Sequence, residues 1–264
     1  MKPLQPVFFL AAFVLLVGLA CSALSGGGTP PTQPPPPTQE PVDVLPTATE
    51  PEPTEPPATE APATEAPLPT EEVPTTSEFF TEEFDSPDAL DNWDSFSLGS
   101  GEDNDLVIEQ EDDHLLFDLG DEDLYVYYMY TPYEYDDVSI KLNAENRGRN
   151  NNNVSLVCRM NSEGTQWYEF SVESGGLWYL YAVDDKYNVI ANGGTNALEQ
   201  GRAVNEYAMT CQGDEITLSI NDEEIRSVTD NTYGFGSGLV GFNISSLNVL
   251  PITVEVNWFE ISQP

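Results

Sequence analysis

Apolar and polar residues alternate with a period of two along short runs in the second part of the chain. Runs such as 154–160 and 207–212 carry an apolar side chain at every second position, and Gly, Asn and Asp separate the runs. This period is typical of β-strands with one buried face. We predict strands over residues 79–84, 106–109, 114–118, 125–130, 137–144, 154–160, 167–172, 177–183, 188–191, 207–212, 215–221, 224–229, 239–245 and 252–261.

The number and shortness of these runs indicate the fold class. About fourteen short strands without a long helical pattern predict an all-β domain over residues 78–264, built as a two-sheet antiparallel jelly-roll sandwich. The alternation also assigns the buried faces of the strands. The side chains expected between the sheets are Val154, Leu156, Cys158, Tyr207, Met209, Cys211, Ile216, Leu218 and Ile220.

Residues 22–77 have a different composition, dominated by Pro, Thr, Glu and Ala. They hold 16 of the 22 prolines and offer few apolar side chains to bury. Such a segment cannot offset the loss of conformational entropy by packing, and its prolines favour an extended polyproline II conformation. We predict a disordered, extended tether here.

The first 21 residues resemble a targeting segment. Lys2 precedes an apolar run over residues 7–20, which is shorter than the roughly 20 residues of a membrane span and is typical of a secretory signal. Residues 18–21, Gly-Leu-Ala-Cys, resemble the lipobox of bacterial lipoproteins, although Gly18 and Leu19 depart from its commonest pattern. The resemblance implies that Cys21 is lipidated and anchors an exported protein at the outer side of a bacterial membrane. An ordinary cleaved signal and an uncleaved anchor are the alternatives.

The charge balance limits which kinds of molecule the protein is expected to bind. The chain has 8 basic and 46 acidic residues, a net charge of -38. A surface this acidic repels phosphate backbones and anionic lipid headgroups, which excludes nucleic acid and leaves the lipid anchor as the contact with a membrane. Solubility at a crowded cell surface is one interpretation of the acidity, and cation binding is the other.

Two cysteines remain if Cys21 is lipidated. Cys158 and Cys211 both fall on the inward faces of predicted strands in an exported protein, where disulfides persist. We therefore predict a Cys158–Cys211 disulfide, which would close a loop of about 50 residues and stabilise the domain by about 4 kcal/mol. Two buried free thiols are the alternative.

Several strings in the domain resemble a known family. They are Val157-Cys158-Arg159, Tyr168-x-Phe170-x-Val172, and residues 211–221, 236–242 and 254–261. Over about residues 80–262 the chain resembles the concanavalin A-like lectin/glucanase (laminin G-like) jelly rolls found on bacterial surface lipoproteins. The resemblance implies the fold. It leaves the function open, because this fold hosts lectins, glycosidases and structural modules.

Catalytic motifs are weak. His114 is the single histidine, so a nucleophilic triad or a His/Cys zinc site is not expected, and no Gly-rich phosphate loop occurs. Laminarinase-type members of the family carry Glu-x-Asp-x-x-Glu or a variant on one strand. The nearest stretch here is Glu169-Phe-Ser-Val-Glu173, where Ser171 replaces the central Asp. That difference argues against this class of hydrolase.

No cofactor is predicted with certainty, but a structural calcium ion is one alternative. Oxygen-rich turns occur at residues 103–105 (Asp-Asn-Asp), 121–123 (Asp-Glu-Asp) and 184–185 (Asp-Asp). Calcium prefers such hard ligands, although none of these turns matches an EF-hand loop. Solvated acidic turns are the other interpretation.

Aromatic residues give the strongest indication of function. We place Trp167, Glu169, Tyr179 and Tyr181 on the face opposite the core, beside Arg159, while six tyrosines crowd residues 125–135. Aromatic rings flanked by polar groups suit sugars, whereas core and cross-strand packing is the alternative role. The leading hypothesis is a non-catalytic surface lipoprotein that binds carbohydrate or another cell-envelope polymer. An enzyme resembling glycoside hydrolases or keto-disaccharide hydrolases, and a structural or adhesive spacer, are the alternatives.

Overall fold

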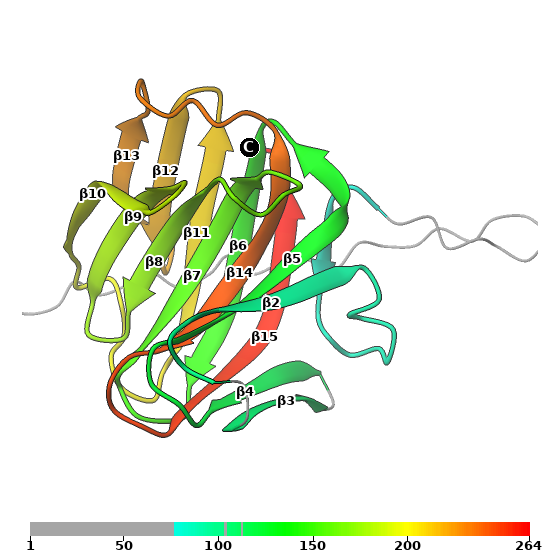
Figure 1. The fold of residues 1–264 in the computed structure, drawn as a ribbon, viewed down its shortest axis with the longest axis vertical. Coiled ribbons are helices and arrows are strands. Elements are labelled where there is room, and N and C mark those ends of the chain that lie inside the picture. The colour runs from blue at the N-terminus through cyan, green and yellow to red at the C-terminus, as the bar shows by residue number, and fades with distance from the viewer. Residues whose placement is uncertain (1–76, 103–104, 112) are drawn as a thin grey trace, which may run out of the picture. The chain divides into compact units, whose positions relative to one another are not determined.

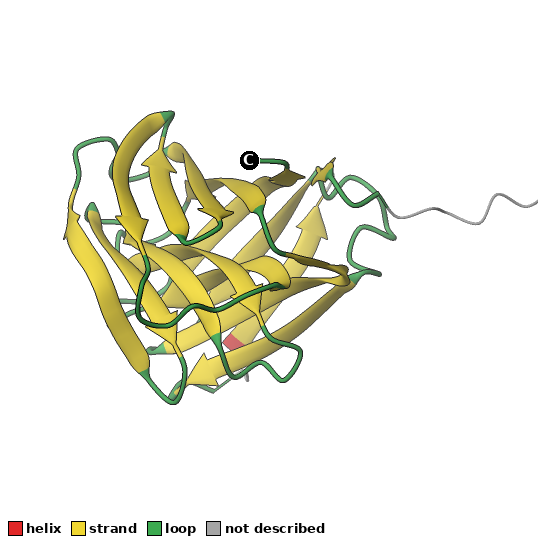
Figure 2. Cartoon of the chain, turned by 90° about the horizontal axis from the view of Figure 1, so that it is seen from above, coloured by secondary structure: helices red, strands yellow, loops and turns green. Residues whose placement is uncertain are grey.

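The computed structural model describes residues 77–264 except 103, 104 and 112. Over these residues the chain forms two antiparallel β-sheets that lie face to face (Figures 1 and 2). This confirms the predicted two-sheet sandwich. The predicted targeting segment and nearly all of the predicted tether lie outside the described residues. Within the described part of the chain, no helix is long and apolar enough to span a membrane.

Neighbouring strands of the two sheets come from distant parts of the sequence. One sheet has eight strands, in the spatial order β13 (Glu223–Thr229), β12 (Glu215–Ile220), β11 (Val204–Gln212), β6 (Val138–Asn146), β15 (Ile252–Ser262), β4 (His114–Leu119) and β3 (Leu106–Glu111), with β1 (Phe80–Glu82) also paired to β15. The other has seven, in the order β10 (Tyr187–Gly194), β9 (Leu177–Val183), β8 (Trp167–Glu173), β7 (Asn152–Met160), β14 (Gly238–Ser246), β5 (Leu124–Tyr135) and β2 (Trp93–Gly99).

The core lies between the sheets, as the alternation predicts. All nine side chains assigned to the core from the sequence are buried there, together with aromatic residues such as Phe117, Phe170 and Phe242. Burial of this apolar surface is the main favourable contribution to folding.

A disulfide joins the two sheets. Cys158 on β7 and Cys211 on β11 are fully buried and bonded, with their Cα atoms 6.9 Å apart and a sequence separation of 53. The predicted pairing is confirmed.

One strand was not predicted. In β2 only Trp93 reaches the core, while Phe96 packs on the outer face of the sheet. Asp and Ser occupy the positions between them, and β2 pairs with β5 at one edge of the sheet. The apolar positions therefore give no run with one continuous buried face, which is the signal that identifies a strand from sequence.

Candidate functional site

The outer face of the seven-stranded sheet carries its own aromatic cluster. Tyr127, Met129, Val157, Met160, Trp167 and Val183 are buried there, away from the core between the sheets. The ring of Tyr127 stacks on Phe96 with a centroid distance of 4.8 Å and an interplanar angle of 2°. A face turned to solvent usually carries polar residues, so this cluster marks an unusual surface.

Two tyrosines meet across this face. The hydroxyls of Tyr127 on β5 and Tyr187 on β10 lie 2.8 Å apart, although four strands separate β5 from β10 in the sheet. In a flat sheet the two strands would lie roughly 24 Å apart, because neighbouring strands are spaced about 4.8 Å. The side chains can meet because the sheet curves strongly. The outer face is therefore concave.

Glu169 lies beneath this tyrosine pair. Its Oε2 accepts hydrogen bonds from the Tyr127 hydroxyl at 2.8 Å and from Nε1 of Trp167 at 3.0 Å. The side chain is only 2% exposed. Burial raises the pKa of Glu169 above its usual value, although the hydrogen bonds from Trp167 and Tyr127 oppose the shift.

A hollow of about 320 Å³ lies beside the aromatic cluster and runs across the strands from β2 to β10. We call it the tyrosine groove. The residues that line it are Leu98, Gly99, Tyr125, Asn153, Glu169, Ser171, Tyr181 and Tyr187. Its size falls in the range of ligand sites in proteins, about 300–1,000 Å³.

The centre of the concave face is polar. Ser155 donates a hydrogen bond to Ser171 at 3.0 Å, and Asn243 and Ser245 on β14 are fully buried. Both amide atoms of Asn243, the Ser245 hydroxyl and Oδ1 of Asn153 are buried without a hydrogen-bond partner. We call Asn153, Ser155, Ser171, Asn243 and Ser245 the polar row. Buried polar atoms are normally paired, so unpaired ones in a row suit a hydroxyl-rich ligand or water.

Aromatic rings border the groove on the side of β9 and β10. Tyr181 stacks on Tyr179 with a centroid distance of 5.6 Å and meets Tyr187 edge to face at 5.5 Å. Burial, followed by the nearby Tyr179, raises the pKa of Tyr181 to about 12, so its hydroxyl stays protonated over the physiological range. The structure thus places Trp167, Glu169, Tyr179 and Tyr181 on the predicted outer face.

Arg159 does not lie in the groove, where it was expected. Three steps along β7, from Val157 to Met160, oppose two steps along β14, from Gly241 to Leu239, so β7 contains a bulge. Arg159 lies in this bulge and has a positive φ of 57°. A bulge shifts the alternation by one residue. The side chain of Met160 therefore points to the aromatic cluster on the outer face. The side chain of Arg159 no longer follows the alternation and does not point to that face.

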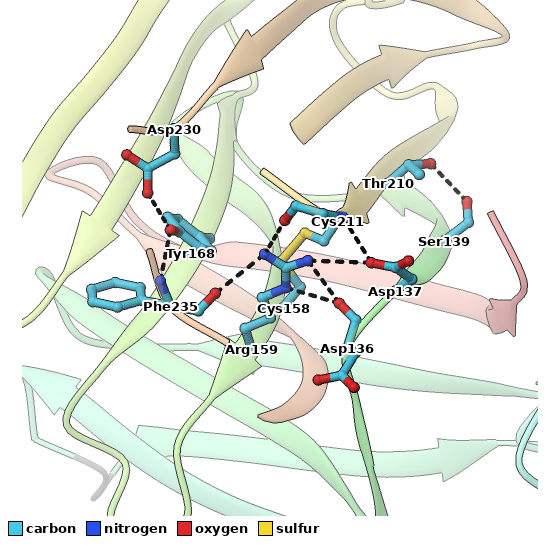
Figure 3. Close-up of a disulfide and its surroundings, with 11 residues drawn as sticks. Asp136, Asp137, Ser139, Cys158, Arg159, Tyr168, Thr210, Cys211, Asp230 and Phe235 are labelled. Carbon is cyan, nitrogen blue, oxygen red and sulfur yellow. Dashed lines mark hydrogen bonds and ion pairs between the residues drawn. A yellow bond between two sulfur atoms is a disulfide. The ribbon is translucent and has the colours of Figure 1, made fainter. Parts of the chain in front are cut away.

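The guanidinium of Arg159 instead ties together three connections at one end of the sandwich (Figure 3). It donates to the carbonyl of Asp136 at 2.7 and 3.0 Å, to that of Gly213 at 2.8 Å and to that of Phe235 at 3.2 Å. Asp137 lies 3.6 Å away as an ion-pair partner. Arg159 is thus a structural side chain, positioned next to the disulfide through Cys158.

Tyr168 and Asp230 form a second hydrogen-bonded group near Arg159. The Tyr168 hydroxyl donates to Asp230, which also accepts hydrogen bonds from the amides of Thr232, Tyr233 and Gly234 (Figure 3 shows the tyrosine contact). Burial by itself would raise the pKa of Asp230, but these hydrogen bonds hold it below its ordinary value. They fix the loop that leads into β14.

Comparison with known proteins supports the fold. No family model and no curated protein matches the chain. Among solved structures, a protein of unknown function with a galectin-like fold from Bacillus subtilis has a TM-score of 0.55 at 14% identity, covering 70% of this chain and 94% of that one. A β-glucanase from Bacillus licheniformis has a TM-score of 0.54 at 13% identity, with coverages of 72% and 100%. A laminarinase from Flavobacterium sp. UMI-01 has a TM-score of 0.52 at 11% identity, with coverages of 70% and 99%.

The domain is a concanavalin A-like jelly roll. At these identities the likeness establishes the architecture, and function has to be argued from the site itself. In this jelly roll the tyrosine groove occupies the concave face of the seven-stranded sheet.

The motif around Glu169 differs from that of laminarinase-type enzymes. Glu169 is buried and bound by two donors of the protein itself, and Ser171 stands where laminarinase-type motifs have Asp. A general acid or base has to reach the substrate, and glycosidases use two such groups. The arrangement favours a structural role for Glu169 in the wall of the groove.

The predicted calcium turns were compared with the acidic side chains of the described residues. No group of three or more His, Cys, Asp or Glu side chains among the described residues could hold a metal ion. Asp121 accepts hydrogen bonds from the amides of Glu102 and Glu122, and Asp123 accepts two from Ser100. Residues 103 and 104, part of one predicted calcium turn, lie outside the described residues.

Several residues of the concave face were not predicted as ligand-binding candidates. Tyr125 and Tyr127 belong to the tyrosine-rich segment noted in the sequence, and their alternation with Val126 and Tyr128 indicates an outer face. Tyr187 and Asn243 carry no comparable local signal, because their role depends on the curvature of the sheet and on strand neighbours far away in sequence.

Proposed function

We propose that this domain binds carbohydrate in the tyrosine groove without cleaving it. The observation that supports the proposal is that aromatic rings line the groove together with the polar side chains of Asn153 and Ser171, and that Oδ1 of Asn153 lacks a hydrogen-bond partner. Tyr125, Tyr181 and Tyr187 supply the rings.

Sugars match both halves of this surface. The apolar faces of a sugar ring stack on aromatic side chains, and its hydroxyls both donate and accept hydrogen bonds. Leaving a buried polar atom unpaired costs about 1–3 kcal/mol, so a ligand that satisfies such atoms gains affinity and specificity.

We expect binding without hydrolysis because, among the residues that the structure describes, the groove lacks a pair of carboxylates placed to act as acid and base. Glu169 is held by Tyr127 and Trp167 in the wall of the groove, and Ser171 cannot act as the second acid. We therefore expect a polysaccharide to leave the groove unchanged. Release of new reducing ends on prolonged incubation would contradict this.

The test is a binding titration of the mature chain against a panel of soluble polysaccharides. Tyr181→Ala and Tyr125→Ala should each weaken binding at least about tenfold, because an aromatic anchor at the centre of a site contributes more than about 1.4 kcal/mol. Tyr233→Ala is the matched control, since Tyr233 lies in the loop beside Asp230, away from the groove. Equal affinities for all three variants, or no binding to any polysaccharide, would overturn the proposal and favour a structural spacer.

We further propose that the domain is displayed outside the cell on a tether, through lipidated Cys21. The support is the short apolar run that ends at a lipobox-like sequence, and the Pro-rich composition of residues 22–77. Metabolic labelling with a fatty acid should mark the wild-type chain and the control Ser22→Ala. It should not mark Cys21→Ala. Labelling of Cys21→Ala would contradict the anchor.

A further inference from the structure

We infer that the tyrosine groove selects uncharged glycans and excludes those that carry carboxylate, sulfate or phosphate groups. The inference rests on the proposed function and names the class of ligand. It is argued from the charges that line the concave face, from the position of Arg159 and from the chemistry of the polar row.

The described residues that line the groove include no Lys, Arg or His. Glu169 lies in its wall, and Glu173 follows on the same strand. The Asp123 carboxylate accepts hydrogen bonds from Ser100, next to Gly99 at one end of the groove. Two fixed hydrogen bonds favour the charged form of Asp123, so this end of the groove is negative.

The rest of the concave face has the same sign. A second hollow lies beyond the aromatic cluster, and it is lined by Asp94, Phe96, Leu98, Met129, Met160, Asn161, Ser162, Glu163, Gly164 and Leu239. It also contains acids and no base. An anionic ligand that extends past the groove therefore meets a further like charge, which opposes its binding.

The bulge at Arg159 is the structural reason for the missing cation. A regular β7 would place Arg159 on the concave face, two residues beyond Val157. Instead its guanidinium is buried, and its donors are used by the carbonyls of Asp136, Gly213 and Phe235. Arginine is the side chain best suited to bind carboxylates and phosphates, so its withdrawal removes that capacity from the groove.

The polar row has the complementary chemistry for hydroxyls. Asn153 lines the groove and offers an unpaired acceptor oxygen, while Asn243 and Ser245 lie fully buried on the neighbouring strand β14. A sugar hydroxyl can donate a hydrogen bond to that acceptor oxygen. A carboxylate or sulfate only accepts hydrogen bonds, so it has no hydrogen to donate to Oδ1 of Asn153.

The first measurement compares matched ligands on the full mature chain. Mixed-linkage β-glucan and galactomannan are titrated beside their carboxymethylated forms at low ionic strength. Each neutral polymer that binds should do so at least about tenfold more tightly than its carboxymethylated form, and added salt should reduce the difference. A carboxymethylated form that binds as tightly as its parent would overturn the inference while leaving glycan binding intact. If neither neutral polymer binds, then the selection for uncharged glycans fails for these probes, and the polysaccharide panel described above decides separately whether the groove binds any glycan.

The second measurement adds a cation to the groove. Leu98→Lys places an ammonium at a groove position that is 38% exposed, and Val107→Lys adds the same charge at a 47% exposed position on β3 of the other sheet. Leu98→Lys should narrow the neutral-to-anionic affinity ratio at least about threefold, while Val107→Lys should leave it near the wild-type value. An equal change in both variants would show that the net charge of the whole chain, rather than the groove, sets the preference, and would overturn the inference.

Discussion

The hydroxyl of Tyr127 on β5 lies 2.8 Å from Oε2 of Glu169 on β8, and it lies at the same distance from the hydroxyl of Tyr187 on β10. One tyrosine thus connects three strands of the concave face and holds a buried carboxylate in place. This arrangement has consequences for stability that can be measured separately from ligand binding.

Removing the hydroxyl of Tyr127 should destabilise the domain. Tyr127→Phe keeps the stacked ring but leaves Glu169 with one fewer donor, which should lower the free energy of unfolding by about 1–3 kcal/mol. Urea denaturation followed by Trp fluorescence measures the change. Tyr179→Phe is the control and should alter the free energy by less than about 0.5 kcal/mol, because its ring only stacks on Tyr181. Equal losses in both variants would contradict the assigned role of Tyr127.

The pH dependence of stability should change in Glu169→Gln. The folded-state pKa of Glu169 is raised above the ordinary value of 4.5, so the contribution of Glu169 to stability is fully present below about pH 4.5 and is lost as the pH rises through the folded-state pKa. The Gln variant does not titrate. Its stability relative to the wild type should therefore increase as the pH rises from about 4.5 through the folded-state pKa of Glu169, as measured by urea midpoints. Other acids titrate in both proteins and cancel, so an unchanged difference would contradict the shift.

Loss of the disulfide should weaken the whole domain. The bond between Cys158 and Cys211 closes a loop with a sequence separation of 53, and its removal in the double variant Cys158→Ala/Cys211→Ala should cost about 4 kcal/mol on the chain-entropy model. Thermal unfolding without reductant gives the comparison. Reductant should lower the midpoint of the wild type and leave the double variant unchanged. A wild type insensitive to reductant under unfolding conditions would argue against this role.

Arg159→Lys should reduce stability without affecting the groove. An ammonium cannot reach the carbonyls of Asp136, Gly213 and Phe235 together, so we expect a loss of about 2–4 kcal/mol. Exposed Arg226 provides the matched control, and Arg226→Lys should stay within about 0.5 kcal/mol of the wild type. Polysaccharide affinity below the unfolding temperature should be the same in all three proteins. A weakened affinity in Arg159→Lys alone would place this residue back in the binding site.

The fold could be predicted from sequence because its signal is local. Residues such as Val154, Leu156 and Cys158 alternate with polar neighbours, and that period fixes both the strand and its buried face. The strand β2 was missed because its apolar side chains divide between the two faces. Strand order, by contrast, depends on pairings between residues far apart in sequence, which no local pattern specifies.

The site could be predicted only in part, for the same reason. The alternation correctly directs Trp167, Glu169 and Tyr181 outward, but it fails at Arg159, where one extra residue in β7 reverses the pattern. The bulge packs closely against Gly238, where an added Cβ would lie 2.4 Å from the carbonyl oxygen of Met160. A single glycine in a Gly-Ser-Gly turn gives no indication of that contact. The meeting of Tyr127 and Tyr187 likewise depends on sheet curvature.

The short strand β1 determines how a mechanical load would enter the domain. A pull on the chain from its N-terminal side arrives at Ser77, whose carbonyl accepts a hydrogen bond from Tyr130, and passes to β1, which pairs with β15 through three residues. This strand belongs to the eight-stranded sheet, whereas the tyrosine groove lies on the other. While β1 stays paired, a force between a bound glycan and the N-terminal chain therefore crosses the sandwich. When the three paired residues of β1 separate from β15, the load passes along the chain to β2, which belongs to the same sheet as the groove and contributes Leu98 and Gly99 to its lining.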